Sequence, residues 1–298
     1  MVAFFLQYIR FQKRRSPHTI LAYENDLKQF SGWLQLQGTE GAENATKYDI
    51  RQWIMELSEE GFSPVSINRK LSCLRAFFDF LRREGKTDVH PMSSIRSLKK
   101  PRRLPVWVKE KSMENLFDVV EFPSGFSGLR DRLVLELLYG TGMRLSELTG
   151  LSFDSISFSD CRILVTGKRN KQRWIPVHKN LMNLILEYQE LLSTLPKEDS
   201  SGFLILTDKG KPAYPVFIER LVNKYLGLVT TEKKKSPHVL RHTFASHLLN
   251  AGADIGAIRD LLGHSSLAAT QVYTHNSVAK LKQAYQLAHP RAKLNSST

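Results

Sequence analysis

Cysteine is scarce in this sequence. Cys73 and Cys161 are the only two among 298 residues, and neither lies in a CxxC pattern. Zinc sites and disulfide frameworks need several cysteines at short spacings, so the sequence predicts neither. We expect both thiols to be small, buried, apolar side chains.

Long apolar runs are also missing. No run reaches the roughly 18 apolar residues that a membrane-spanning helix needs. The first residues, MVAFFLQYIRFQKRR, are apolar and then basic. A signal peptide has the opposite order, followed by a cleavage site with small residues. The sequence therefore predicts no membrane association and a cytoplasmic protein.

Positive charge is abundant. The chain has 43 Lys and Arg against 29 Asp and Glu, a formal net charge of +14. The excess positive charge is evenly distributed along the chain, because residues 1–105 and residues 106–298 each carry +7. Such a balance favours a polyanionic partner, most often nucleic acid, although charge can also serve solubility alone.

The first 95 residues are predicted to be helical. Ser16-Pro17 and Ser63-Pro64 each pair a capping serine with a proline at the first helical position, and a further helix is expected over 47–58. Basic residues decorate the helix that begins at Ser63-Pro64. As DNA contacts we select Arg69, Lys70 and Arg75. For any one of them, an ordinary solvated surface is the alternative.

Residues 96–105, RSLKKPRRLP, are predicted to be a basic linker, because two prolines discourage regular structure there. A basic linker between two basic domains suggests a clamp around a duplex, although a plain solvated hinge would have the same composition. The linker residues selected as DNA contacts are Lys99, Lys100, Arg102 and Arg103.

The remainder is predicted to be mixed. Alternating apolar residues over 162–166 and 172–177, on either side of GKRNK, predict a β-hairpin with a basic turn. Helices are expected on both sides of this hairpin, and the last residues look disordered. The expected helices are 129–139, 179–193, 214–227, 237–250, 254–262, 267–275 and 277–287.

The segment SPHVLRHTFASHLLNAG begins a helix at Ser236-Pro237. It places His238 and Arg241 three residues apart in the first turn, where free N–H groups already favour anions. An imidazole and a guanidinium added there indicate a phosphate site. His238 and His242 also have the i, i+4 spacing of metal ligands, but no other ligand motif accompanies them. His242 and His247 are therefore expected to be structural.

Two further segments carry candidate residues. In TGMRLSELTGL, Arg144 begins a helix and Glu147 can brace its guanidinium. In LLGHSSLAATQVYTH, His264 sits in a turn and Tyr273 follows nine residues later. Each of these residues alone would be ordinary: a surface ion pair, a satisfied polar residue and a packed aromatic.

Their order is specific: Arg144, then His238-x-x-Arg241, then His264 and Tyr273. In this order the chain resembles the tyrosine recombinase (phage integrase) family over nearly its whole length, and most of all the bacterial Xer recombinases. The resemblance implies a mostly α-helical fold with a small β-hairpin or sheet. It implies a helical, SAM-like core-binding domain at 1–95, the linker at 96–105, a mixed α/β catalytic domain at 106–290 and a tail at 291–298.

The resemblance also implies roles. Tyr273 would be the nucleophile that forms a 3′-phosphotyrosine, His238 would take its proton, and His264 would donate to a phosphate oxygen. Lys168, which matches the family's catalytic lysine, would protonate the leaving 5′-oxygen. Arg144 and Arg241 would neutralise the phosphate, with no cofactor, metal or ATP. In the same turn, Arg169 and Lys171 are expected to contact DNA.

The partners implied are a double-stranded recombination site and further recombinase protomers, in a homo- or hetero-tetramer that passes through a Holliday junction. The segment after Tyr273, with Leu281, Tyr285 and Leu287, would dock on a neighbour or pack on its own domain. Chromosome dimer resolution is the expected role. A mobile-element integrase, a type IB topoisomerase and a non-catalytic DNA-binding protein are the alternatives.

Overall fold

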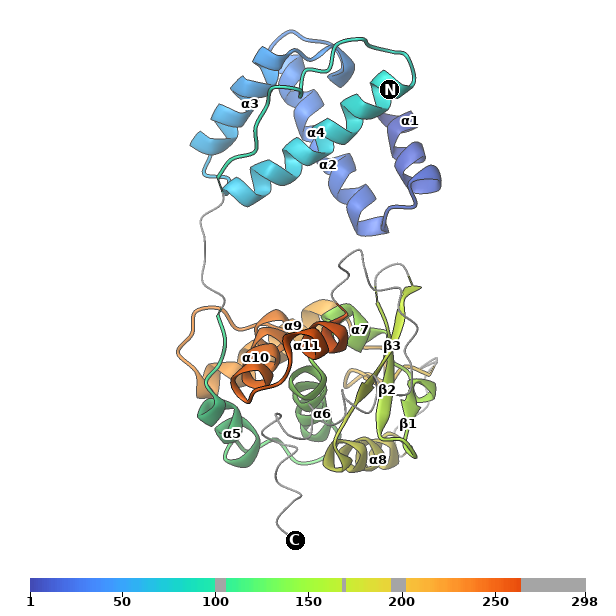
Figure 1. Ribbon diagram of the computed structural model, residues 1–298, viewed down its shortest axis with the longest axis vertical. Coiled ribbons are helices and arrows are strands. Elements are labelled where there is room, and N and C mark those ends of the chain that lie inside the picture. The colour runs from blue at the N-terminus through green and yellow to red at the C-terminus, as the bar shows by residue number, and fades with distance from the viewer. Residues whose placement is uncertain (100–105, 168–169, 194–201, 264–298) are drawn as a thin grey trace. The chain divides into compact units, whose positions relative to one another are not determined.

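The computed structural model describes residues 1–99, 106–167, 170–193 and 202–263. The chain divides into two compact units, Met1–Arg103 and Leu104–Thr298, here called the N-terminal and the C-terminal unit (Figure 1). The chain is mostly helical with one small sheet, as predicted. Among the described residues, no helix is long and apolar enough to cross a membrane.

The N-terminal unit is a helical bundle. Its helices are α1 (Val2–Gln7), which continues into the π-helix η1 (Tyr8–Gln12), α2 (Pro17–Leu36), the 3-10 turn η2 (Ala42–Asn44), α3 (Lys47–Glu59) and α4 (Pro64–Arg83). Ser16 and Ser63 cap α2 and α4 as predicted, each accepting from the backbone N–H three residues on. Thr46 and Asp49 form a reciprocal capping box on α3. Within the first 95 residues, no separate helix was predicted before Ser16, where the structure has α1 and η1.

Aromatic side chains fill the core of this bundle. Phe5 from α1 meets Phe77 edge-on at a centroid distance of 5.5 Å, and Phe30 from α2 lies 4.8 Å from Trp53 of α3. All four are almost fully buried. In α2, α3 and α4, the buried face is therefore the one that the 3.6-residue spacing predicts.

Lys70 is a correction to the predicted DNA contacts. It is only 5% exposed, and its Nζ lies 3.1 Å from Oδ1 of the buried Asp26. It also donates to Gln29 and lies over the rings of Trp53 and Phe62. A buried ammonium needs such partners to offset its lost hydration, so Lys70 joins α4 to α2 and does not face a phosphate.

We expect Asp26→Ala to lower the free energy of unfolding by about 3 to 5 kcal/mol, because it leaves the Lys70 ammonium buried without its counter-charge. The surface pair Lys28–Glu24 on the same helix supplies the control, and Glu24→Ala should change stability far less. Denaturant unfolding of the whole chain, followed by tryptophan fluorescence, measures both. Equal effects of the two substitutions would contradict the assignment.

The C-terminal unit combines helices with a three-stranded antiparallel sheet of order β1-β2-β3. Leu164 pairs with Trp174 in the predicted hairpin, whereas α5 and β1 were not predicted. The elements are α5 (Glu110–Asp118), α6 (Phe126–Thr141), α7 (Leu145–Thr149), η3 (Phe153–Ser155), β1 (Ile156–Ser157), β2 (Arg162–Thr166), β3 (Gln172–Pro176), α8 (Lys179–Ser193), α9 (Pro215–Val229), α10 (Pro237–Asn250) and α11 (Ile255–Leu262).

Helix α6 is the centre of this unit. Its residues 133–141 are all buried, and it contacts α8 on one side and α10 on another (Figure 1). It ends at Gly142, which has a left-handed backbone with φ of 60°. A Cβ on Gly142 would lie 2.4 Å from Cδ1 of Phe244, so only glycine permits this close approach of the chain to α10.

The inner face of α10 is fixed by hydrogen bonds. Thr243 accepts from the backbone N–H of Val108 at 3.0 Å, and Nε2 of His247 donates to the carbonyl of Val108 at 2.9 Å. Nδ1 of His247 must then accept, and the hydroxyl of Tyr139 donates to it at 2.9 Å. Burial lowers the pKa of His247, in keeping with a neutral ring. The predicted structural role of His247 is confirmed.

Candidate functional site

Glu147 is the centre of the site. Its buried carboxylate accepts from the backbone N–H of Arg144 and from Nη1 of Arg144, both at 2.8 Å. Arg144 caps the N-terminus of α7, and its side chain is 37% exposed. The predicted bracing of Arg144 by Glu147 is confirmed, and the bond leaves part of the guanidinium at the surface.

Arg173 on β3 is a second, unpredicted partner of Glu147. Its Nη1 and Nη2 donate to the two carboxylate oxygens of Glu147, each at 2.9 Å, and its Nε donates to the carbonyl of Leu261 at 2.7 Å. The sequence held a signal for it. Alternation along β3 places Arg173 on the same buried face as Ile175, and a buried arginine needs a carboxylate.

Arg241 approaches the same place from α10. Its Nη1 donates to the carbonyl of Gly142 and its Nη2 to that of Leu262, each at 2.5 Å. Burial, together with the charges of Arg144 and Arg173, lowers the pKa of Arg241 to about 10, although the charge of Glu147 acts in the opposite direction. At neutral pH the guanidinium is therefore still charged.

The local charge balance favours an anion. The guanidinium groups of Arg144 and Arg173 act electrostatically both on Arg241 and on the single carboxylate of Glu147. Burial alone would raise the pKa of Glu147, but the bonds from Arg173 and Arg144 outweigh it and the pKa is lowered. The carboxylate is ionised and two positive charges are left over. An anion with several oxygens would complete this arrangement.

His238 lies on the exposed side of the first turn of α10, three residues before Arg241. Its Nε2 is 3.0 Å from Nε2 of His242. The structure thus places the predicted imidazole and guanidinium on one helical turn. It also gives His242 a partner that the sequence did not indicate.

Among the predicted site residues of the C-terminal unit, Lys168, Arg169, His264 and Tyr273 lie outside the described residues. The residues that directly precede two of them do lie at the arginine group. A Cβ on Gly167 would lie 3.2 Å from Oε1 of Glu147, and one on Gly263 would lie 3.1 Å from Nη1 of Arg173. The carbonyl of Gly263 also accepts from Nη2 of Arg144 at 3.1 Å.

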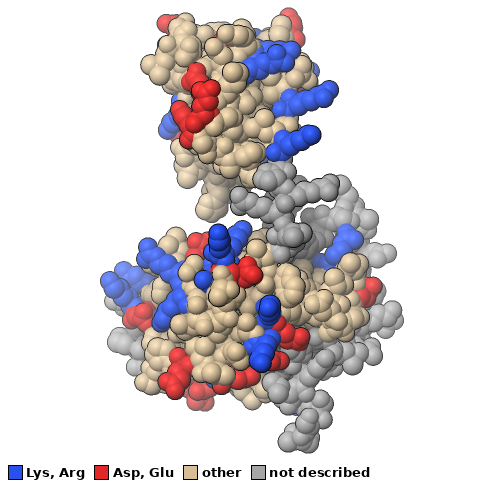
Figure 2. Space-filling model, turned by 90° about the vertical axis from the view of Figure 1, so that its left-hand side faces the viewer, with Lys and Arg blue, Asp and Glu red and all other residues tan. Residues whose placement is uncertain are grey.

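The predicted DNA contacts differ in exposure and in the partners they bind. Arg69 is about half exposed and pairs with Asp26, and Arg75 donates to the carbonyl of Ile95 at 3.0 Å. Lys99 and Lys171 are exposed. The linker residues Lys100, Arg102 and Arg103 lie outside the described residues. Figure 2 shows Lys and Arg side chains on the visible face of each unit, with acidic ones among them.

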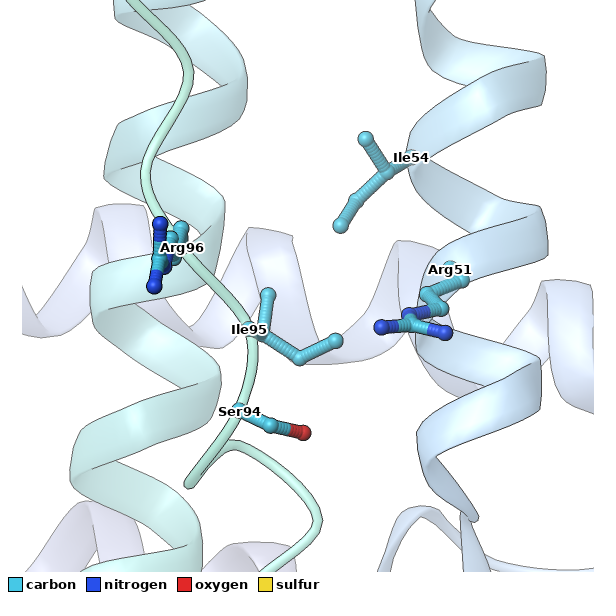
Figure 3. Close-up of a pocket in the computed structure, with 5 residues that line it drawn as sticks. All are labelled: Arg51, Ile54, Ser94, Ile95 and Arg96. Carbon is cyan, nitrogen blue, oxygen red and sulfur yellow. The ribbon is translucent and has the colours of Figure 1, made fainter.

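The N-terminal unit has an additional basic feature that the sequence did not single out. Arg51 on α3 and Arg96 in the segment after α4 line a pocket of about 330 Å³ together with Ser94 (Figure 3). Both arginines are exposed. The pocket belongs to the N-terminal unit, whereas the Glu147 group belongs to the C-terminal unit. Among the described residues, no group of three or more His, Cys, Asp or Glu side chains could hold a metal ion.

Comparison with known families matches both units. Residues 106–280 match the model of the phage integrase family, and residues 2–85 match the N-terminal SAM-like domain of phage integrases. The chain is 38% identical over 292 residues to the tyrosine recombinase XerC of Listeria innocua, covering 97% of each chain. It is 36% identical over 294 residues to XerC of Bacillus subtilis, covering 98% of this chain and 96% of the relative.

Solved structures share the fold. The Tn1549 transposon integrase in complex with transposon right end DNA matches with a TM-score of 0.71 at 22% identity, over 95% of this chain and 98% of that chain. The XerH site-specific recombinase bound to a palindromic difH substrate matches with a TM-score of 0.71 at 19% identity, over 96% and 84%. At these identities the likeness concerns the fold alone.

We expect Glu147→Ala to lower the free energy of unfolding by about 3 to 5 kcal/mol, since Arg173 is left buried without its counter-charge. The exposed Glu114 on α5 supplies a matched control, and Glu114→Ala should cost less than about 0.5 kcal/mol. Denaturant unfolding of the whole chain measures both.

The double variant Glu147→Met, Arg173→Met separates stability from site geometry. Replacing both partners with apolar side chains should recover much of the lost stability. It should not recover the function of the site, because Arg144 still lacks the carboxylate that holds its guanidinium. A double variant that is stable and fully active would show that Glu147 serves folding only.

Proposed function

Because the chain belongs to the phage integrase family of tyrosine recombinases, we propose that Tyr273 cuts and rejoins DNA at the arginine group around Glu147. The relatives are tyrosine recombinases over almost their full length, and the chain is a site-specific DNA strand-transferase of the Xer type. We propose a core-binding domain at 1–95, a linker at 96–105, a catalytic domain at 106–290 and a tail at 291–298.

The observation that supports this active site most strongly is that Arg144 and Arg173 bond to the carboxylate of Glu147 while Arg241 interacts electrostatically with all three. A phosphodiester is an anion that resists attack by a nucleophile. Guanidinium groups fixed in place neutralise the charge that builds up on its non-bridging oxygens in the transition state. Arg144 and Arg241 are proposed to bind these oxygens, and Arg173 to hold Glu147.

The remaining steps are assigned from the matching residues. The phenolic oxygen of Tyr273 attacks the phosphorus, and His238 takes the phenolic proton as general base. His264 donates a hydrogen bond to a phosphate oxygen, and Lys168 protonates the departing 5′-oxygen. The proximity of Gly167 and Gly263 to the arginine group supports Lys168 and His264, since each directly follows one of these glycines. The 3′-phosphotyrosine conserves the energy of the phosphodiester bond that was broken, so rejoining needs no ATP and no cofactor.

The chain binds a DNA recombination site, and we propose that it does so in the cytoplasm as one protomer of a homo- or hetero-tetramer. The two basic units and their linker would hold the duplex between them. Arg69, Arg75, Lys99, Lys100, Arg102, Arg103, Arg169 and Lys171 remain proposed DNA contacts. Chromosome dimer resolution is favoured over mobile-element integration, because the full-length relatives at 36–38% identity are XerC proteins. Sequencing the DNA crosslinked to the chain in cells would test this role.

We expect Tyr273→Phe to abolish the covalent adduct with DNA and to leave DNA affinity nearly unchanged, because only the attacking oxygen is removed. Adduct formation is read from a denaturing gel and affinity from fluorescence anisotropy. Tyr214, an exposed tyrosine at the start of α9, offers a control, and Tyr214→Phe should form the adduct normally. An adduct in the Tyr273→Phe variant would require another nucleophile.

We expect Lys168→Ala to slow cleavage of ordinary DNA by about a hundredfold or more, and cleavage of DNA with a 5′-thio leaving group far less. An alkoxide needs a proton as it departs, whereas a thiolate leaves without one. Arg144→Ala should slow both substrates, because the phosphate charge persists whichever atom leaves. Single-turnover cleavage rates measure the difference. Equal slowing of both substrates by Lys168→Ala would reject it as the acid and make Lys171 the next candidate.

A further inference from the structure

His242 is a half-buried histidine for which the proposed mechanism has no role. It lies one helical turn beyond His238 on α10, and the two Nε2 atoms are 3.0 Å apart. The ring centroids are 4.4 Å apart and the ring planes meet at 78°, so one ring points edge-on toward the other. The bonds of Thr243 and His247 to Val108 hold the inner face of the same helix in place.

A hydrogen bond between two imidazole nitrogens holds one proton. One Nε2 carries it and donates, and the other Nε2 accepts with its lone pair. In a neutral pair, the donor ring therefore has no proton on its Nδ1, whereas the acceptor ring has one there. Two charged rings would bring two N–H groups face to face at 3.0 Å, so the contact is incompatible with both rings being protonated.

This rule determines which nitrogen of His238 can act as a base. Its Nε2 is engaged with His242, so the proton of the tyrosine has to be taken by Nδ1. Nδ1 is unprotonated only when Nε2 carries the proton and donates it to His242. When Nδ1 has taken a proton, the ring is an imidazolium and its bond to His242 becomes charge-assisted and stronger.

From this geometry we propose that His242 is a positioning residue for the recombination reaction: by accepting from Nε2 of His238, it selects the basic tautomer of His238 and stabilises the imidazolium formed during cleavage. The inference rests on the proposed role of His238 as general base. The proton moves from the phenol of Tyr273 to Nδ1 of His238, and the bond to His242 is kept throughout.

The surroundings of His242 suit an acceptor. Burial lowers its pKa, and the positive charges of Arg241 on α10 and Lys234 in the preceding segment lower it further. Together with His238, these are the charged and titratable groups that act on it in the described chain. A lowered pKa keeps the ring neutral at pH 7, so its lone pair is available. The acceptor is lost only as the pH falls through that lowered pKa.

Three variants of α10 test the proposal on the DNA site recovered by crosslinking, nicked beside the scissile phosphate to trap the adduct. His242→Leu removes the acceptor, whereas His242→Gln offers Oε1 in its place. Ser246→Ala lies one further turn along the same face and is the matched control. Single-turnover cleavage rates are measured from about pH 5 to 9, across the titration range of histidine.

We expect His242→Leu to lower the maximal rate by about tenfold or more, as for the loss of a hydrogen bond to a charged group. The acid limb of its pH profile should move down by about one pH unit, because the imidazolium of His238 has lost its acceptor. His242→Gln should retain most of the rate, and Ser246→Ala all of it. A His242→Leu variant with the original rate and acid limb, or a His242→Gln variant as slow as His242→Leu, would overturn the proposal.

A second measurement does not depend on cleavage. Long-range ¹⁵N–¹H spectra of the histidine-labelled full chain identify the tautomer of each ring, and His238 should carry its proton on Nε2 and His242 on Nδ1. The opposite pair of tautomers would overturn the proposal. If Tyr273→Phe still formed the adduct, the proposed active site would fail, whereas the tautomers would still decide whether His242 accepts from His238.

Discussion

The site in the C-terminal unit depends on the hydrogen bonds that the carboxylate of Glu147 accepts. This carboxylate accepts from Arg144 at the start of α7 and from both terminal nitrogens of Arg173 on β3. Through these two arginines it also connects to the end of α11, because Arg173 donates to Leu261 and Arg144 to Gly263. A buried charge is costly unless it is fully paired, and here the pairing joins three segments that are remote in sequence. The same pairing leaves a surplus of positive charge for an anionic substrate.

Helix α10 packs into the core with one face and carries proposed site residues on the other. Thr243 and His247 bind the chain at Val108, and Phe244 packs against Gly142 at the end of α6. These contacts fix the helix, so that Arg241 reaches the carbonyls of Gly142 and Leu262 while His238 and His242 meet on its exposed side. Histidine therefore has two roles within ten residues. His247 is a neutral, fully bonded core residue, whereas the outer pair, His238 and His242, share a hydrogen bond between their Nε2 atoms.

The N-terminal unit shows why positive charge alone does not locate a DNA contact. Arg69 and Lys70 are neighbours on α4 and look alike in the sequence, yet Lys70 is buried against Asp26 and Trp53 while Arg69 stays half exposed. The difference is one of helical phase, since consecutive residues are about 100° apart around the axis. Arg51 and Arg96, from separate segments, share a pocket that no local pattern indicates (Figure 3).

The sequence by itself determined the features that depend on neighbouring residues. Serine-proline pairs set the starts of α2 and α4, alternation set the β2–β3 hairpin, and the ordered residues Arg144, His238, Arg241, His264 and Tyr273 indicated the family. Tertiary structure alone decided which charges meet. Glu147 lies 26 residues from Arg173, and His247 lies 139 from Val108. Such partners are chosen by packing, because a buried charge or polar group can bond only with whatever the folded core brings within about 3 Å of it.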